Sequence, residues 1–119
     1  IVGPQSWDER EDERRAAYEA QRGLFLVHST RPSSVPGQTV DILLRLHQHG
    51  PGPLTEGTVK SVEYHLGPKF SKRTITKDNP SDGFALGISA YGPLLCLARV
   101  HFDDGSNPLE LQRYVNIDL

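Results

Sequence analysis

A hydrophobic pattern with a period of two runs through most of the chain after residue 23 and limits its fold more than any other feature. Apolar side chains at every second position, as at Val40, Ile42 and Leu44, are typical of a β-strand with one buried face. The alternation predicts strands at residues 24–30, 40–46, 58–66, 73–76, 84–88, 94–102 and 109–117. The 94–102 segment starts apolar on both faces, so we expect this strand to be central in its sheet.

Turn-forming segments separate these strands at short intervals. They are rich in Gly, Pro, Asn, Asp and Ser and cover residues 31–37, 50–53, 78–83 and 103–108. Such connections are too short for the crossover helices that parallel strands require. We therefore predict an all-β fold, an immunoglobulin-like antiparallel β-sandwich of about seven strands over residues 24–119, preceded by one helix. The Cys and Trp signature of antibody domains is absent.

The first 23 residues have a different character. Residues 7–22 hold six acidic residues and four arginines but little apolar surface. Ser6 and Glu9 fit a capping box, which predicts a helix from Trp7 to Arg22, and Gly23 suits a left-handed helix cap. We interpret residues 1–23 as a linker helix leading into the domain at 24–119. A docking helix for an upstream partner is the alternative.

Composition excludes several classes of protein. A chain of 119 residues holds one domain, which excludes a two-domain enzyme. The net charge of -2 gives no field that would hold nucleic acid, and no apolar run approaches the ~20 residues that cross a bilayer. We expect this segment to contact neither nucleic acid nor membrane. The chain begins at Ile1 without Met, so we expect other domains of the same parent chain as partners, and the parent could carry a membrane anchor upstream.

The single cysteine, Cys96, cannot form an internal disulfide. Because it lies in an apolar strand, we expect it to be a small core residue in a protein of a reducing compartment, with a cytoplasmic location.

Polar clusters give only weak indications of chemistry. His47 and His49 alternate as a metal pair on a strand would, but no third ligand is evident, so a solvated strand end is the main interpretation and a metal-dependent enzyme the minor one. Residues 103–107 have the oxygen atoms of a calcium loop without its terminal Glu, and we predict a hairpin turn at Asp104-Gly105. We interpret the remaining histidines, His28, His65 and His101, as ordinary strand positions.

The chain contains no glycine-rich phosphate loop and no nucleophile paired with a base. We predict that the domain is not an enzyme and has no cofactor.

Two loops place an aromatic ring beside glycine and proline just outside a strand: Gly67-Pro-Lys-Phe70 and Ala90-Tyr-Gly-Pro93. Loops at the ends of a sandwich often carry binding functions. Phe70 and Tyr91 could form two walls around a flat group, or they could close the ends of the core. The residues alone leave both interpretations open.

At these residues the chain resembles a YEATS domain. The stretch Val59-Lys-Ser-Val-Glu-Tyr-His-Leu-Gly-Pro-Lys-Phe70, the pair Tyr91-Gly92 and the stretch Leu97-Ala-Arg-Val-His-Phe-Asp-Asp-Gly105 are similar to the family's motifs in order and spacing. The resemblance covers about residues 24–119. It is strongest to prokaryotic YEATS-like modules, which are attached to other domains in bacterial signalling and defence proteins.

The resemblance implies a function and a site. Eukaryotic YEATS domains are immunoglobulin-like folds that read acetylated and crotonylated lysine by holding the flat acyl amide between two rings. Phe70 matches the ring of the first loop and Tyr91 that of the second. Gly67 replaces a histidine of the pattern, Lys69 replaces a serine that bonds the acyl amide, and Leu94 replaces a further aromatic. The expected ligand-binding residues are Gly67, Lys69, Phe70, Ala90, Tyr91, Gly92 and Leu94.

The sequence thus predicts a non-enzymatic module that recognises a modified peptide or protein, or a small ligand, for a larger bacterial signalling or defence protein. The alternative is a protein interaction or assembly domain without a small-ligand pocket.

Overall fold

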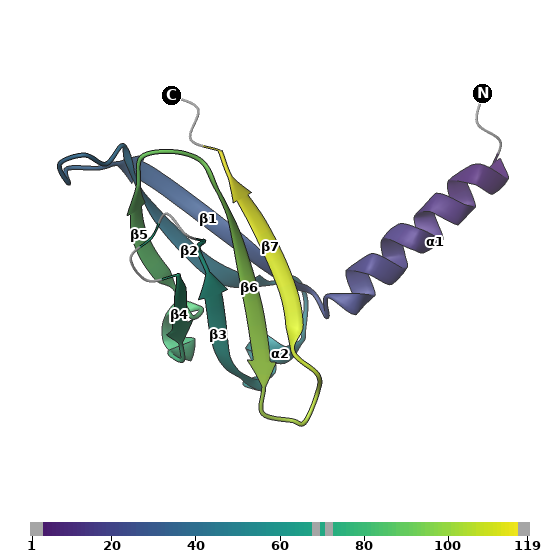
Figure 1. Cartoon of the computed structure of the whole chain (residues 1–119). Helices are drawn as coiled ribbons and strands as arrows, with labels where there is room; N and C mark the ends of the chain where they lie inside the picture. Colours follow the sequence, from purple (N-terminus) through teal and green to yellow (C-terminus); the bar gives the residue numbers. More distant parts are fainter. Residues whose placement is uncertain (1–3, 68–69, 71–72, 117–119) are drawn as a thin grey trace.

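The protein consists of two antiparallel β-sheets packed face to face, with one long helix leaving one end (Figure 1). The computed structural model describes residues 4–67, 70 and 73–116. The strands are β1 (Leu24–Pro32), β2 (Val40–Gln48), β3 (Val59–His65), β4 (Thr74–Lys77), β5 (Leu86–Ala90), β6 (Leu94–Phe102) and β7 (Leu109–Val115). The helical elements are α1 (Pro4–Ala20), α2 (Pro53–Glu56) and the 3₁₀ turn η1 (Pro80–Asp82).

The sheet topology confirms the predicted sandwich. One sheet has the strand order β1-β2-β5 and the other β4-β3-β6-β7, and every pairing is antiparallel. Each predicted strand is present, with ends that differ by two residues at most; residue 117, the predicted end of the last strand, lies outside the described residues. β6 lies between β3 and β7, so the expectation that it is central is also confirmed.

The alternating apolar positions of both sheets form one core, which includes the fully buried Tyr64 and Cys96. The Tyr64 Oη donates a hydrogen bond of 2.6 Å to the backbone carbonyl of Phe84, which satisfies the one polar atom of this large side chain. Burial raises the pKa of the Cys96 thiol to about 12. Cys96 is therefore a core residue, as expected.

The predicted start of the first helix is wrong. α1 begins at Pro4, so Ser6 lies inside the helix and its backbone is not at the N-cap position. The fixed φ of proline suits the first helical position, which explains the earlier start. The helix ends at Ala20, two residues before the predicted end, because Arg22 and Gly23 both have positive φ (55° and 73°). The left-handed conformation expected for Gly23 is confirmed.

Two local features after the helix were not predicted correctly. Phe84 was expected inside a strand, but it precedes β5, has a φ of 57° and buries its ring in the core. The 50–53 segment was interpreted as a turn alone, whereas Pro53 starts the short helix α2, in which Thr55 exchanges hydrogen bonds with Gly52. At Phe84, burial of the ring in the core overrides the alternating pattern, whereas after residue 52 local hydrogen bonds extend the predicted turn into a helix.

The helix α1 is exposed along residues 10–20 and is held to the sandwich at its C-terminal end. The Tyr18 hydroxyl donates to His49 Nδ1, and Arg22 forms an ion pair of 3.4 Å with Asp104 while its guanidinium lies 4.4 Å from the centre of the Phe102 ring. Within the described part of the chain, no helix has the length and apolar character needed to span a membrane.

Candidate functional site

Residues of three connections lie together at the end of the sandwich opposite the point where α1 joins β1: residues 33–39 between β1 and β2, the described residues Leu66, Gly67 and Phe70 between β3 and β4, and residues 91–93 between β5 and β6 (Figure 1). The Leu66 N–H donates to the Arg73 carbonyl (2.7 Å), which closes the base of the second loop. The Thr39 N–H donates to the Ala90 carbonyl (2.9 Å), which ties the first loop to the third. The first loop is therefore tied to the end of β5, where the third loop begins, and the second loop is closed at its base.

A cavity of about 470 Å³ opens between these loops. Six of the predicted binding residues line it: Gly67, Phe70, Ala90, Tyr91, Gly92 and Leu94. The seventh, Lys69, lies outside the described residues. Ligand sites of small molecules commonly measure ~300 to 1,000 Å³, so the cavity has room for an acyl-lysine side chain.

The two aromatic rings of the cavity are held differently. Phe70 is half-buried and packs against the core, and its N–H donates to the Gly67 carbonyl (3.3 Å). Tyr91 is 60% exposed, so it does not close the core. One ring is thus fixed by the core and the other stands at the rim.

Glycine brings the cavity close to the backbone at two positions. A Cβ atom built on Gly67 or Gly92 would meet nothing within 4 Å, because the space beside each is open. Gly67 has a φ of 94°, a conformation that favours glycine, whereas Gly92 does not have a positive φ. A flat group can therefore approach the main chain of the 91–93 loop.

Sequence reasoning missed five residues that line the cavity: Gln38, Leu66, Ser89, Pro93 and Leu95. Ser89 has a structural partner, since its hydroxyl donates to Asp41 Oδ1 at 2.7 Å. Gln38 differs, because its Oε1 is buried and has no hydrogen-bond partner among the described residues. Gln38 lies one residue after a turn segment, and no local pattern distinguished it.

A second cavity, of about 540 Å³, lies over the outer face of the β1-β2-β5 sheet. Its central carboxylate, Asp41, accepts a hydrogen bond from Ser89 and pairs with Arg31 at 3.3 Å. The bond from Ser89, together with those from Ser33 and Arg31, holds the pKa of Asp41 below its usual value. Arg31 and Ser89 therefore already compensate the negative charge of the Asp41 carboxylate within the protein.

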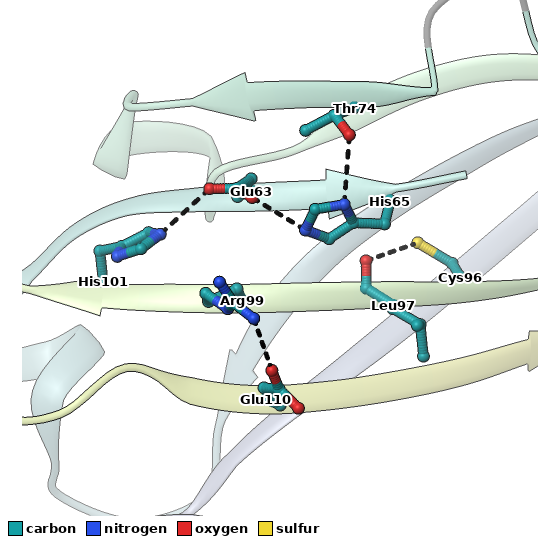
Figure 2. A network of polar contacts seen from close by, with 8 residues as sticks. All are labelled: Glu63, His65, Thr74, Cys96, Leu97, Arg99, His101 and Glu110. Atoms are coloured by element: carbon teal, nitrogen blue, oxygen red, sulfur yellow. Dashed lines mark hydrogen bonds and ion pairs between the residues drawn. The ribbon is translucent and has the colours of Figure 1, made fainter. Parts of the chain in front are cut away.

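A polar network covers the outer face of the other sheet (Figure 2). The Nε2 atoms of His65 and His101 each donate to the Glu63 carboxylate, at 2.9 and 3.3 Å. Beside them Arg99 donates to Glu110 at 2.8 Å. The sequence interpretation of His65 and His101 as ordinary strand positions missed this network, in which His65 and Glu63 lie two residues apart on β3 while His101 comes from β6.

The described residues contain no group of three or more side chains suited to a metal ion. His47 is exposed near the end of β2, and His49 lies beyond the strand, where it accepts the bond from Tyr18. The solvated strand end predicted for this pair therefore holds for His47, while His49 anchors the helix. Residues 103–108 connect β6 and β7, as expected of a hairpin.

A family model described as the prokaryotic YEATS domain matches residues 40–116. No curated protein matches the chain.

Among solved structures, the Yaf9 YEATS domain recognizing an H3K122suc peptide is 12% identical with a TM-score of 0.66, covering 80% of this chain and 71% of that one. The Yaf9 YEATS domain bound to H3K27ac is 12% identical with a TM-score of 0.61, covering 81% and 71%. Yeast Yaf9, described as an AF-9 homolog, is 13% identical with a TM-score of 0.63, covering 82% and 68%. At these identities the likeness establishes the fold alone, whereas the family model covers more than half of the sequence. The chain therefore belongs to the prokaryotic YEATS domain family.

Proposed function

We propose that this domain is a non-enzymatic module that recognises a modified residue, an acylated lysine or a similar flat group, between the aromatic residues of its loops. The observation that carries the proposal is the cavity of about 470 Å³ with Phe70 and Tyr91 in its wall. The binding residues are Phe70, Tyr91, Gly92, Gly67, Ala90 and Leu94, with Lys69 as a further candidate.

The chemistry of the wall favours a neutral ligand. Among the described residues that line the cavity none is acidic, so the ammonium group of an unmodified lysine would lose water there without gaining a charged partner. Acylation removes that charge and creates a planar amide. A planar amide can stack on the exposed ring of Tyr91 while its methyl or alkyl end contacts apolar side chains such as Leu94. The complexes of Yaf9 with H3K27ac and H3K122suc support an acylated lysine as the class of ligand, of which the acetylated form is neutral.

A second candidate function is protein interaction or assembly without a small ligand. It is favoured by three exposed apolar side chains on the outer face of the four-stranded sheet, Leu95, Leu97 and Tyr114. Leu95 and Tyr114 face each other across β6 and β7. The open cavity and the exposed Tyr91 give the ligand-binding function the stronger support.

We also propose the context of the module. Residues 1–23 act as a linker that joins residues 24–119 to other domains of a bacterial signalling or defence protein in the cytoplasm. Support comes from the family resemblance, from the exposed polar surface of α1 and from the thiol of Cys96 in the core.

The proposal is tested by NMR titration of the labelled domain with short peptides that carry unmodified, acetylated or crotonylated lysine. We expect the acylated peptides to shift resonances of loops 33–39, 66–73 and 91–93 and the unmodified peptide to shift none. Tyr91→Ala should abolish these shifts. Tyr114→Ala is the matched control, because Tyr114 is 57% exposed, close to the 60% of Tyr91, but lies outside the cavity.

If no peptide shifts a resonance at millimolar concentration, acyl-lysine recognition is refuted. The interaction domain then becomes the leading function. Equal effects of the two tyrosine substitutions would show that binding occurs outside the cavity.

A further inference from the structure

One buried acceptor in the wall of the cavity has no partner. Gln38 lines the cavity from the loop between β1 and β2, and its Oε1 is shielded from solvent. Within residues 4–67, 70 and 73–116, no donor forms a hydrogen bond with this atom. Buried side-chain acceptors in folded proteins nearly always have a partner. An exception beside a cavity is expected where a ligand supplies the missing donor.

The backbone around Gln38 is fixed with respect to Tyr91. The Gln38 N–H donates to the Val35 carbonyl (3.1 Å), and the Thr39 N–H donates to the Ala90 carbonyl (2.9 Å). The Thr39 hydroxyl also donates to the Tyr91 carbonyl at 3.5 Å. The main chain that carries the unpaired amide is therefore held at a constant position relative to the main chain of Tyr91, and only the side-chain torsions of Gln38 are left to place the amide in the cavity.

The remaining side chains of the described wall leave few polar groups for a ligand. They are mostly apolar, and the Ser89 hydroxyl is engaged by Asp41. Among the described residues that line the cavity, Gln38 is the one with a side-chain amide. The terminal torsion of a glutamine rotates easily, so Oε1 can turn from its shielded position toward the cavity when a donor arrives.

We propose that Gln38 determines the specificity of the cavity by accepting a hydrogen bond from an N–H of the ligand. The cavity then selects flat groups that carry an N–H beside a carbonyl, which are secondary amides such as acylated lysine, over ketones or esters of the same shape. This inference rests on the proposed function and adds to it the atom that reads the amide nitrogen.

The test compares two peptides that differ in one group. One carries acetyl-lysine, and the other carries its ketone analogue, in which the side-chain N–H is replaced by CH₂. We expect the unsubstituted domain to bind the acetyl-lysine peptide about tenfold more tightly, which corresponds to one hydrogen bond. Gln38→Leu should bind both peptides equally, at the affinity that the unsubstituted domain has for the ketone.

Gln112→Leu is the matched control, since Gln112 is exposed on β7 and does not line the cavity. It should keep the tenfold preference. If Gln38→Leu keeps the preference, or if the unsubstituted domain shows none, the role of Gln38 is overturned while acyl-lysine recognition stands. If neither peptide binds, the role of Gln38 and the proposed function both fail.

A second measurement requires no ligand. Because Gln38 Oε1 has no partner in the described structure, Gln38→Leu should leave the Tm unchanged or raise it. A Tm that falls by several degrees, while that of Gln112→Leu does not, would show that the Gln38 amide is already bonded within the protein. That result would overturn the proposal independently of peptide binding.

Discussion

The two ends of the sandwich each contain a phenylalanine outside the strands, but the two rings have different surroundings. At the α1 end, Phe84 is 1% exposed and its carbonyl accepts the hydrogen bond from Tyr64. At the loop end, Phe70 is half-buried and lines the cavity of about 470 Å³. The Phe84 ring therefore completes the core, whereas the Phe70 ring leaves space beside the core.

Polar groups differ in the same way between the two ends. At the α1 end, Tyr18 bonds His49, Arg22 pairs with Asp104, and Gln48 donates to the Arg22 carbonyl (3.0 Å). At the loop end, the described part of the chain leaves Gln38 Oε1 without a partner. The difference indicates that one end is stabilised internally, while the other retains groups that a ligand can satisfy.

The largest expected effect concerns the two phenylalanines. Phe84→Ala should lower the free energy of unfolding by about 3–5 kcal/mol, because it empties a fully enclosed site. Phe70→Ala should lower it by only about 1–2 kcal/mol, because the Phe70 ring is half-buried and has fewer contacts to lose. Urea unfolding followed by circular dichroism measures both. Equal losses would show that the loop end is closed by Phe70, which would remove the distinction between the ends.

The next effect separates binding from stability at the loop end. Gly92→Ala should weaken binding of an acetyl-lysine peptide by about tenfold, because the added methyl group projects into the space that the ligand would use. It should leave the free energy of unfolding nearly unchanged, since a Cβ there meets no atom within 4 Å and the residue does not have a positive φ.

Gly87→Ala is the matched control for this substitution. Gly87 is also open and free of positive φ, but it lines the cavity over the outer sheet face instead. Isothermal titration calorimetry on both variants should show a loss for Gly92→Ala alone. Unchanged binding by Gly92→Ala would place the ligand elsewhere.

Most of the fold could be predicted from the sequence, because period-two alternation and short turns are local signals. The predicted strands are confirmed, including the central position of β6. The failures occur where a local preference or a distant contact changes the outcome. The helix α1 already begins at Pro4, so Ser6 is not its N-cap residue. Phe84 was predicted within a strand, but it has a positive φ and buries its ring in the core.

The candidate site was less accessible to sequence reasoning. Phe70 and Tyr91 were singled out by the glycine and proline beside them, the family motifs then matched them to the two rings, and both line one cavity. Gln38 was missed, because its relation to the cavity depends on hydrogen bonds between Thr39 and the end of β5. His101 also reaches Glu63 only after β3 pairs with β6, although His65 and Glu63 lie two residues apart on β3. Contacts between residues distant in the sequence leave no local signal.

A smaller effect is expected at the α1 end. Tyr18→Phe removes the hydroxyl that donates to His49 and should cost about 0.5–1 kcal/mol, the usual net value of one hydrogen bond. The main consequence should be that α1 moves more freely relative to the sandwich. Residual dipolar couplings measure this motion, because the couplings of the helix should no longer fit the alignment tensor of the sandwich. Tyr91→Phe, at the opposite end, should leave the couplings of α1 unchanged. A helix that moves independently of the sandwich before any substitution would contradict the contact.

The smallest effect is a pH dependence at the side of the sandwich, where β1 meets β7. Arg113 Nε donates to His28 Nδ1 at 2.8 Å, so the imidazole must be neutral at this nitrogen. Burial, together with the charge of Arg113, lowers the pKa of His28 below its usual value of 6.5. The unfolded chain therefore binds a proton more readily than the folded one.

It follows that the His28 contribution disfavours folding as the pH falls through about 6.5 and has no effect well above that value. Urea unfolding at pH 7.5 and pH 5.5 should show a larger loss of stability for the unsubstituted domain than for His28→Gln, whose side chain retains an acceptor for Arg113 but does not titrate. If both proteins lose the same stability between these pH values, the folded pKa of His28 is not lowered. The hydrogen bond between Arg113 on β7 and His28 on β1 would then not prevent the imidazole of His28 from accepting a proton.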